Sequence, residues 1–362
     1  MTELVDSSTR PLGHADFDLA RVDAIPPSNC PVRDCSATLA NLVYGKQYDR
    51  DGEPKERMMP WCPEHDIRLH SGTFVYWNGD DRRDDSRLRN FIVQKDLVTA
   101  IALKPGAKAE AHRLGYEMSE DALSWNVFVS LAVAGKLKEA GEWLTGRSLS
   151  AEPELYLWGQ RIGVKGSNQG TYEALRQVRA ALESGIARFG TEPDVMLVVK
   201  RGEMVICIEA KFGSGNPLAY DGDEREGEKP ASRAGLLKKY LGASTTVRTK
   251  TAMRPANMAP RLHSQLFRNV VFASEMTEKD WHVVNLVSRT QHQDKKDSAR
   301  SSFADPTDDV RSYLSPDSQV CFTYRTWEDL YAALVKDTPE LGQLGLYLRG
   351  KSAHYRPAFN LA

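Results

Sequence analysis

The 362-residue sequence lacks the features that identify membrane and secreted proteins. No apolar run is long enough to span a bilayer, and the longest, around residues 125–134, is interrupted by Asn126 and Ser130. The N-terminal residues include Glu3 and Asp6 and contain no apolar stretch of the kind found in secretory signals. We therefore expect a cytoplasmic protein that does not enter membranes.

The chain also has almost no overall charge. Its formal net charge is −1, so the total charge does not indicate a nucleic-acid partner. Charge is nevertheless unevenly distributed, because residues 229–268 contain no acidic residue. Eight basic residues lie between positions 231 and 268: Arg233, Lys238, Lys239, Arg248, Lys250, Arg254, Arg261 and Arg268. This segment is expected to be either a local phosphate-binding surface or a solvated loop.

Cysteine is scarce, with five residues, and an odd number without a secretion signal argues against a disulfide framework. Cys207 and Cys321 lie in β-like runs and are expected to be buried thiols. The other three precede residue 63.

Those three cysteines form a pattern with histidine. Cys30 and Cys35 are separated by four residues, and Cys62 and His65 by two, with 26 residues between the pairs. Two short-spaced ligand pairs are typical of a tetrahedral Cys₃His zinc site, which would stabilise a unit too small to fold by hydrophobic burial alone. Unliganded thiols are the alternative, and His70 is the alternative ligand to His65.

From about residue 110 the apolar pattern alternates between helical and β periods, which predicts an α/β fold. The expected elements are a helix at 120–131 capped by Ser119, a strand at 154–162, a helix at 170–184, strands at 194–199 and 204–208, a helix at 261–273, a strand at 281–287 and a helix capped by Thr326.

The two central strands flank Arg201-Gly202, which suits a two-residue hairpin turn. Counting outward from that turn places Asp194 opposite Glu209, with Cβ atoms about 5 Å apart on one sheet face. Lys211 lies two residues beyond Glu209, so its side chain emerges on the same face.

Two adjacent carboxylates repel each other unless a cation lies between them, and hard oxygen ligands suit Mg²⁺. The cation can activate a water molecule and neutralise charge on a phosphate, while Lys211 orients the attacking water. The alternative is an ordinary ion pair between Glu209 and Lys211 on a structural strand.

Pro193-Asp194, followed by Glu209-Ala210-Lys211 on the next strand, resembles the active-site signature of the PD-(D/E)xK nucleases over about residues 115–290. The resemblance implies a restriction-endonuclease-like core, in which helices flank a mixed central sheet. It also implies a DNA endonuclease that depends on Mg²⁺ or Mn²⁺, with the backbone carbonyl of Ala210 as a further metal ligand.

Two more site residues are implied only by this resemblance. Glu120 is the favoured acid on the core helix because it shares a face with Leu123, while Asp121 remains open. Gln265 corresponds to a glutamine on a later helix of some family members. A homodimer or higher homo-oligomer is implied as well, since endonucleases with one active site per chain commonly pair to cut both strands.

We expect a disordered tail at residues 1–22, a zinc-ribbon-like unit at 23–80, a linker at 81–110 and a nuclease domain at 111–362. A chain with its own zinc unit most resembles endonucleases of restriction or anti-phage defence, by analogy of fold. A DNA repair or recombination nuclease and a non-catalytic zinc-ribbon DNA-binding protein are the alternatives.

Overall fold

The computed structural model describes residues 10–22, 24, 26–48, 54–70, 72–77, 85–102, 113–163, 170–183, 192–220, 261–293 and 302–361. Of the basic segment at 229–268, residues 229–260 lie outside the described residues. The chain divides into two compact units, Met1–Asn126 with Gly342–Ala362, and Val127–Leu341. Among the described residues, no helix has both the length and the hydropathy needed to cross a bilayer.

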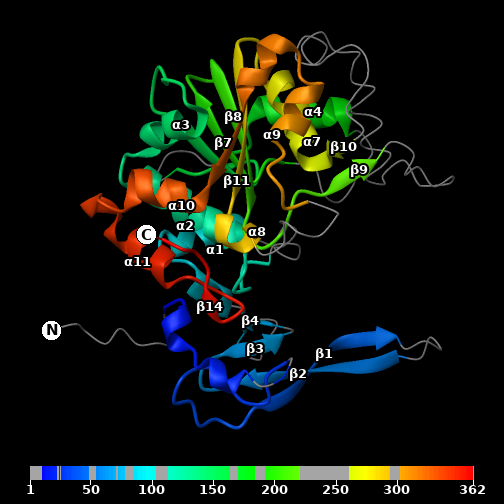
Figure 1. Ribbon diagram of the computed structural model, residues 1–362, viewed down its shortest axis with the longest axis vertical. Helices are drawn as coiled ribbons and strands as arrows, with labels where there is room; N and C mark the ends of the chain where they lie inside the picture. Colours follow the sequence, from blue (N-terminus) through cyan, green and yellow to red (C-terminus); the bar gives the residue numbers. More distant parts are fainter. Residues whose placement is uncertain are drawn as a thin grey trace. The chain divides into compact units, whose positions relative to one another are not determined.

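The second unit contains a six-stranded mixed sheet with strand order β12-β11-β8-β7-β5-β6 (Figure 1). Its strands are β5 (Glu154–Leu157), β6 (Gln160–Arg161), β7 (Val195–Val199), β8 (Met204–Lys211), β11 (Asp280–Val287) and β12 (Phe322–Thr326). β8, β11 and β12 are parallel, whereas β5 to β8 pair antiparallel. Every residue of β7 and β8 is buried, as expected for strands that are covered on both faces.

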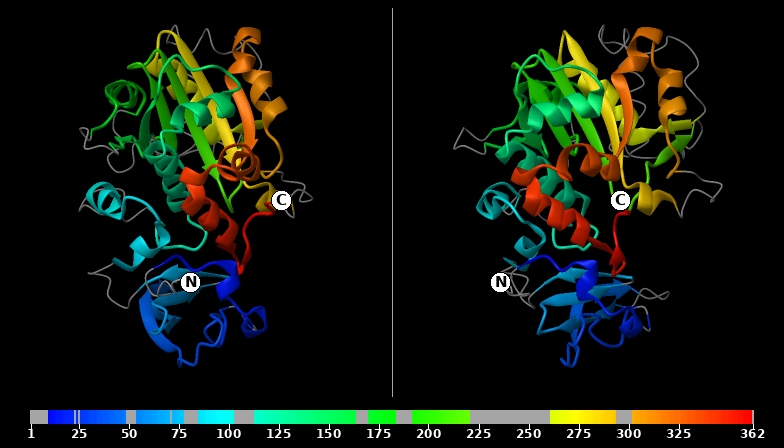
Figure 2. Two further views of the ribbon diagram at one scale, coloured as in Figure 1. Left: turned by 90° about the vertical axis from the view of Figure 1, so that its left-hand side faces the viewer. Right: turned by 60° about the vertical axis from the view of Figure 1, so that its left-hand side comes forward.

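Helices cover the two faces of this sheet (Figure 2). On one face, α4 (Glu173–Leu182), α7 (Ser264–Met276) and α9 (Thr307–Tyr313) pack in an apolar core that includes Met196 and Cys207. On the other face, α3 (Leu137–Thr145) lies so close that a Cβ on Gly141 would be 3.5 Å from the Leu197 side chain. The expected α/β fold is thus confirmed as a mixed sheet flanked by helices.

The other helices in the described part of the chain are α1 (Lys95–Ala102), α2 (Glu120–Val133), α8 (Arg289–Gln293), α10 (Trp327–Leu330) and α11 (Gly342–Gly350). A two-stranded sheet pairs β9 (Leu218–Tyr220) with β10 (Arg261–His263), and another pairs β13 (Ser352–Ala353) with β14 (Arg356–Pro357). Short 3₁₀ or π segments are η1 (His14–Asp16), η2 (Leu19–Arg21), η3 (Asp85–Asn90), η6 (Pro316–Cys321), η7 (Tyr331–Val335) and η8 (Pro339–Leu341).

The first unit is built on a four-stranded antiparallel sheet in sequence order. Its strands are β1 (Ala40–Tyr48), β2 (Pro54–Cys62), β3 (Ile67–His70) and β4 (Thr73–Tyr76). Phe17 and Tyr355, from opposite ends of the chain, pack on Phe74 of this sheet. The Tyr355 N–H also donates a hydrogen bond to Glu117 Oε1 at 3.0 Å.

These contacts change the expected division of the chain. The expected tail at 1–22 contains the buried residues Leu12 and Phe17, which belong to the core of the first unit. The expected nuclease domain at 111–362 loses its last part to the same unit, because Tyr355 packs there. The first unit therefore joins segments from both ends of the chain, and composition alone does not reveal this grouping.

Two expected elements also differ. The strand expected at 154–162 is a hairpin, because Trp158 and Gly159 have φ values of 51° and 69° and reverse the chain. The helix expected from residue 261 begins at Ser264, since the preceding residues pair with β9. The expected helix caps are confirmed: Ser119 Oγ accepts from Ala122 N at 3.1 Å, and Thr326 Oγ1 from Asp329 N at 3.1 Å.

Candidate functional site

The register of the β7–β8 hairpin determines which side chains share a face. Val195 pairs with Ile208, so Asp194 and Glu209 form the next pair outward. The sequence predicted this pairing from the turn. Both acids lie at the open end of the hairpin, where β8 continues to Lys211.

The turn itself is longer than the expected two residues. Val199 pairs with Met204, and the four residues between them form a loop outside the ladder. Lys200 and Arg201 have left-handed φ values of 42° and 57°, and Gly202 has 104°. Because the flanking pair is the predicted one, the longer loop leaves every side chain on its predicted face.

Asp194, Glu209 and Lys211 lie next to one another at the open end of this hairpin. The Lys211 Nζ atom donates a hydrogen bond to Glu209 Oε1 at 2.6 Å. The backbone N–H of Ala210 donates to Asp194 Oδ2 at 2.9 Å. Glu209 has no exposed surface and Lys211 only 4%, whereas Asp194 is half-buried. The group is thus a buried ion pair with a more accessible carboxylate beside it.

Helix α7 supplies two partners that sequence analysis missed. Asn269 Nδ2 donates to Glu209 Oε2 at 2.9 Å, and Arg268 Nη2 lies 3.5 Å from the same oxygen. Asn269 is fully buried. Both residues lie one helical turn after Gln265. The sequence therefore predicted the helix that contacts Glu209, but it did not predict which of its residues make the contact.

The electrostatic environment keeps Glu209 ionised. Burial is the largest single effect and would raise its pKa, but the charges of Lys211 and Arg268, together with hydrogen bonds from Lys211 and Asn269, outweigh it. The net result is a pKa below the ordinary glutamate value. Glu209 is therefore an acceptor or a metal ligand rather than a proton donor.

A buried amide pair continues this polar region across the sheet. Asn285 of β11 is in register with Glu209, and its Nδ2 donates to the Glu209 carbonyl oxygen at 3.4 Å. Asn216 Nδ2 in turn donates to Asn285 Oδ1 at 2.9 Å. These groups lie at the carboxyl ends of parallel strands, where α/β folds commonly bind ligands.

The side-chain oxygens of this group are of the type that a hydrated hard cation prefers. Mg²⁺ commonly binds proteins through one or two carboxylates, keeping several waters, and Asp194 with Glu209 supplies two. Asn269 Oδ1 is buried and has no hydrogen-bond partner among the described residues, so it can accept from a cation-bound water. Such a cation would polarise a water and neutralise charge on a phosphate.

Three further residues considered for the site lie elsewhere in the chain. Glu120 and Asp121 form the first turn of α2 and are half-buried. Glu120 belongs to the unit Met1–Asn126, whereas Asp194 belongs to Val127–Leu341. Gln265 is half-buried in the first turn of α7. The roles of these three residues stay predictions.

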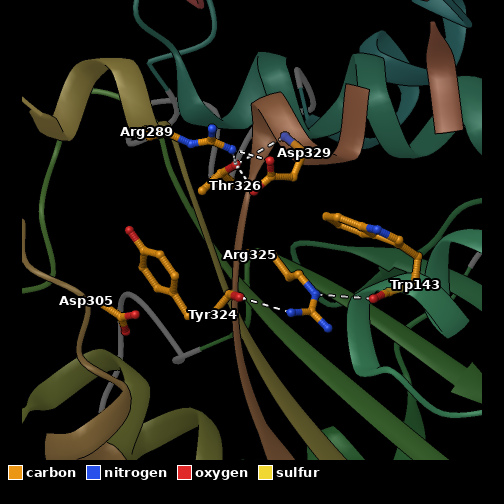
Figure 3. Close-up of a pocket in the computed structure, with 7 residues that line it drawn as sticks. All are labelled: Trp143, Arg289, Asp305, Tyr324, Arg325, Thr326 and Asp329. Atoms are coloured by element: carbon orange, nitrogen blue, oxygen red, sulfur yellow. Dashed lines mark hydrogen bonds and ion pairs between the residues drawn. The ribbon is translucent and has the colours of Figure 1, made fainter. Parts of the chain in front are cut away.

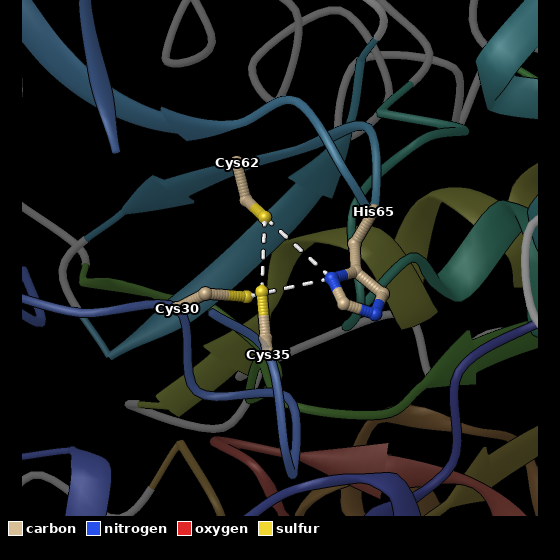
Figure 4. A group of neighbouring side chains, drawn as sticks. All are labelled: Cys30, Cys35, Cys62 and His65. Atoms are coloured by element: carbon tan, nitrogen blue, oxygen red, sulfur yellow. Dashed lines mark hydrogen bonds between the residues drawn. The ribbon is translucent and has the colours of Figure 1, made fainter. Parts of the chain in front are cut away.

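The predicted metal ligands of the first unit come together (Figure 4). The ligand atoms of Cys30, Cys35, Cys62 and His65 all lie within 4.8 Å of one another, and all four residues are buried. Cys35 Sγ lies 3.7 Å from Cys62 Sγ, and His65 Nδ1 lies 3.5 Å from Cys62 Sγ. The cluster can hold a metal ion.

These separations are consistent with zinc. Bond lengths of about 2.3 Å to sulfur and about 2.0–2.1 Å to nitrogen give tetrahedral edges of about 3.8 Å between sulfurs and about 3.6 Å between sulfur and nitrogen. No disulfide joins the cysteines. His70, the alternative ligand, lies instead beside the Tyr116 ring, with centroids 6.2 Å apart. Cys207 and Cys321 are buried thiols, as expected.

Comparisons with protein-family models, with curated protein sequences and with solved structures found no match to this chain. The interpretation of both sites therefore depends on their own geometry and chemistry.

Proposed function

We propose that this protein is a Mg²⁺-dependent DNA endonuclease of the PD-(D/E)xK type. The observation that carries the proposal is the convergence of Asp194, Glu209 and Lys211 at the open end of one hairpin. Two acids and an amine on one sheet face are the groups that metal-assisted phosphodiester hydrolysis needs.

In this proposal the side chains of Asp194 and Glu209 and the carbonyl of Ala210 hold the cation. Lys211 Nζ, 2.6 Å from Glu209 Oε1, orients the attacking water and stabilises charge on the phosphate. Glu120 adds an acid from α2, and Gln265 lies near the substrate from α7. Mn²⁺ replaces Mg²⁺ in such oxygen sites, since both prefer hard ligands.

The wider assignment is also part of the proposal. The cluster of the first unit binds structural zinc, the protein acts in the cytoplasm in restriction or anti-phage defence, and the chain forms a homodimer to cut both strands. A DNA repair or recombination nuclease is the nearest alternative. Discrete fragments from a plasmid would favour restriction, whereas cutting only at ends or branches would favour repair.

A second function is favoured by one specific observation. Glu209 has no exposed surface, and both its oxygens contact protein donors. This is also the arrangement of a structural buried ion pair. On that reading the chain is a non-catalytic zinc-ribbon protein that binds DNA without cutting it.

Plasmid cleavage separates the two functions. Wild type should cut supercoiled plasmid in Mg²⁺, and Lys211→Ala should lower the rate at least about 100-fold while DNA binding persists. Lys200→Ala is the matched control, because Lys200 lies at the other end of the hairpin in an exposed pair with Glu203. Its rate should stay within about twofold of wild type.

Two results would contradict the nuclease proposal. One is a wild-type protein that binds plasmid but leaves it intact in both Mg²⁺ and Mn²⁺. The other is equal cleavage by wild type and Lys211→Ala. The first result would support the zinc-ribbon binding protein.

A further inference from the structure

A hollow of about 510 Å³ lies at the outer edge of the six-stranded sheet (Figure 3). β12 is the edge strand, and it contributes Tyr324, Arg325 and Thr326 to the lining. In Figure 3, Tyr324 points to one side of β12, while Arg325 and Trp143 lie on the other. The volume is within the range of small-ligand sites, about 300–1,000 Å³.

Tyr324 in the lining of the hollow is in register with Glu209 of the candidate site. Parallel pairing aligns Tyr324 with Asn285, and Asn285 with Glu209, so the three side chains emerge in one row on one face. Neighbouring strands are about 4.8 Å apart, which places Tyr324 about 10 Å from Glu209 across the sheet. That separation is about three base steps of 3.4 Å each.

Arg325 is fixed by contacts on two sides. Its Nε donates to the Trp143 carbonyl oxygen at 3.2 Å, and its Nη1 to the Tyr324 carbonyl oxygen at 3.3 Å. The guanidinium also lies over the Trp143 ring, 5.4 Å from its centroid. Arg325 Nη2 makes no hydrogen bond to any residue within the described ranges. A fixed guanidinium with an uncommitted donor suits a phosphate oxygen.

Arg289 brings a second guanidinium to the same hollow. It pairs with Asp329 and donates to Thr326 Oγ1 at 3.1 Å. Asp329 also accepts from the Thr326 hydroxyl at 2.7 Å, and Asp305 accepts from Thr307 N at 2.9 Å. Because both acids are engaged and offset the arginine charges, a ligand is attracted by directed hydrogen bonds and stacking rather than by net positive charge.

Tyr324 supplies the stacking surface. The ring is half-buried at the sheet edge. Burial and the nearby Asp305 raise the pKa of Tyr324 to about 12, so its hydroxyl is neutral at physiological pH. A neutral, partly exposed aromatic ring is a common platform for a nucleic-acid base.

We propose that this hollow binds one nucleotide of a nucleic-acid strand. Its base stacks on Tyr324, and its two flanking phosphates accept hydrogen bonds from Arg289 and Arg325, one on each side of the strand β12. The substrate class rests on the nuclease function proposed above. The hollow would hold the strand a few nucleotides from the scissile bond and so position it in the hydrolytic site.

Binding of a fluorescent single-stranded oligonucleotide tests this proposal. Fluorescence anisotropy would be measured without Mg²⁺ on Lys211→Ala protein, so that cleavage does not intervene. In the Lys211→Ala protein, a second substitution Tyr324→Ala should weaken oligonucleotide binding about tenfold. Tyr324→Phe in the same protein should leave binding unchanged, because the ring rather than the hydroxyl stacks on the base. Arg325→Ala should lower the slope of log K against log salt by about 0.7.

The exposed Arg289 gives a variant that is expected to fold, and Arg289→Ala should also weaken binding. Its matched control is Arg176→Ala, since Arg176 forms a similar exposed pair with Glu173 on α4. The proposal is overturned if Tyr324→Ala and Arg289→Ala both bind within twofold of the parent, or if no oligonucleotide binds at all. Tyr324-dependent binding by a wild type that never cuts would uphold the hollow and reject the nuclease.

Discussion

Glu209 is the most deeply buried acid of the candidate site, and its contacts decide how the site can work. A buried carboxylate costs several kcal/mol unless it is paired and hydrogen-bonded, and here Lys211, Arg268 and Asn269 provide that compensation. Arg268 and Asn269 contact Glu209 Oε2, so in the proposal we assign them as positioning residues. They hold the carboxylate in one orientation.

Asn269→Ala tests this positioning role. Loss of its hydrogen bond to Glu209 should raise the Mg²⁺ concentration for half-maximal cleavage about tenfold, because partners of metal ligands typically contribute 10- to 100-fold in affinity. KM for DNA should stay unchanged. The Mg²⁺ dependence is measured together with the melting temperature. An unchanged half-maximal Mg²⁺ concentration in a folded variant would show that Asn269 has only a structural role.

At the scale of elements, the β7–β8 hairpin carries most of what the sequence predicted. The side-chain period of a strand is two residues, so a turn and two β-like runs were enough to place Asp194, Glu209 and Lys211 on one face. The four residues of the possible metal site were also predictable, because short spacings bring Cys30 and Cys35, and Cys62 and His65, together in local turns.

Other features depend on long-range packing that local patterns do not encode. Asn269 meets Glu209 across a separation of 60 residues, which requires the exact rotation of α7 over β8. Tyr355 joins the first unit only because the end of the chain returns to it. The loop at Lys200 was missed because left-handed non-glycine residues carry little sequence signal.

Gly202→Ala tests the geometry of the hairpin loop. Gly202 has φ 104°, and an added Cβ would lie 2.7 Å from the Tyr172 hydroxyl oxygen. The substitution should lower the free energy of unfolding by about 1–2 kcal/mol, measured by urea denaturation. Gly170→Ala is the control, because a Cβ there meets nothing within 4 Å and φ is not positive. Equal stability of both variants would contradict the loop conformation.

At the scale of the whole molecule, the two units obtain their stability differently. The second unit has a large apolar core around its sheet. The four-stranded sheet of the first unit packs on a smaller cluster that includes Cys30, Cys35 and Cys62 themselves. A unit of this kind commonly depends on metal, since structural zinc contributes about 10–16 kcal/mol of binding free energy to folding.

His65→Ala should therefore remove zinc and unfold the first unit, while the second unit stays folded. Zinc content is measured by mass spectrometry, with one ion expected per wild-type chain, and local unfolding by hydrogen exchange. His70→Ala is the matched control, because His70 lies on β3 outside the cluster and should retain zinc. Protection of β1–β4 that survives loss of the metal would argue against a structural zinc site.

The central claim is that Asp194 and Glu209 together bind a divalent cation, and calorimetric titration of the zinc-loaded protein with Mn²⁺ tests it most directly. The account predicts one Mn²⁺ bound per wild-type chain and at least about tenfold weaker binding by Asp194→Asn, which keeps the shape but removes the charge of the more accessible carboxylate. Absence of Mn²⁺ binding by wild type, or equal binding by the two proteins, would contradict it.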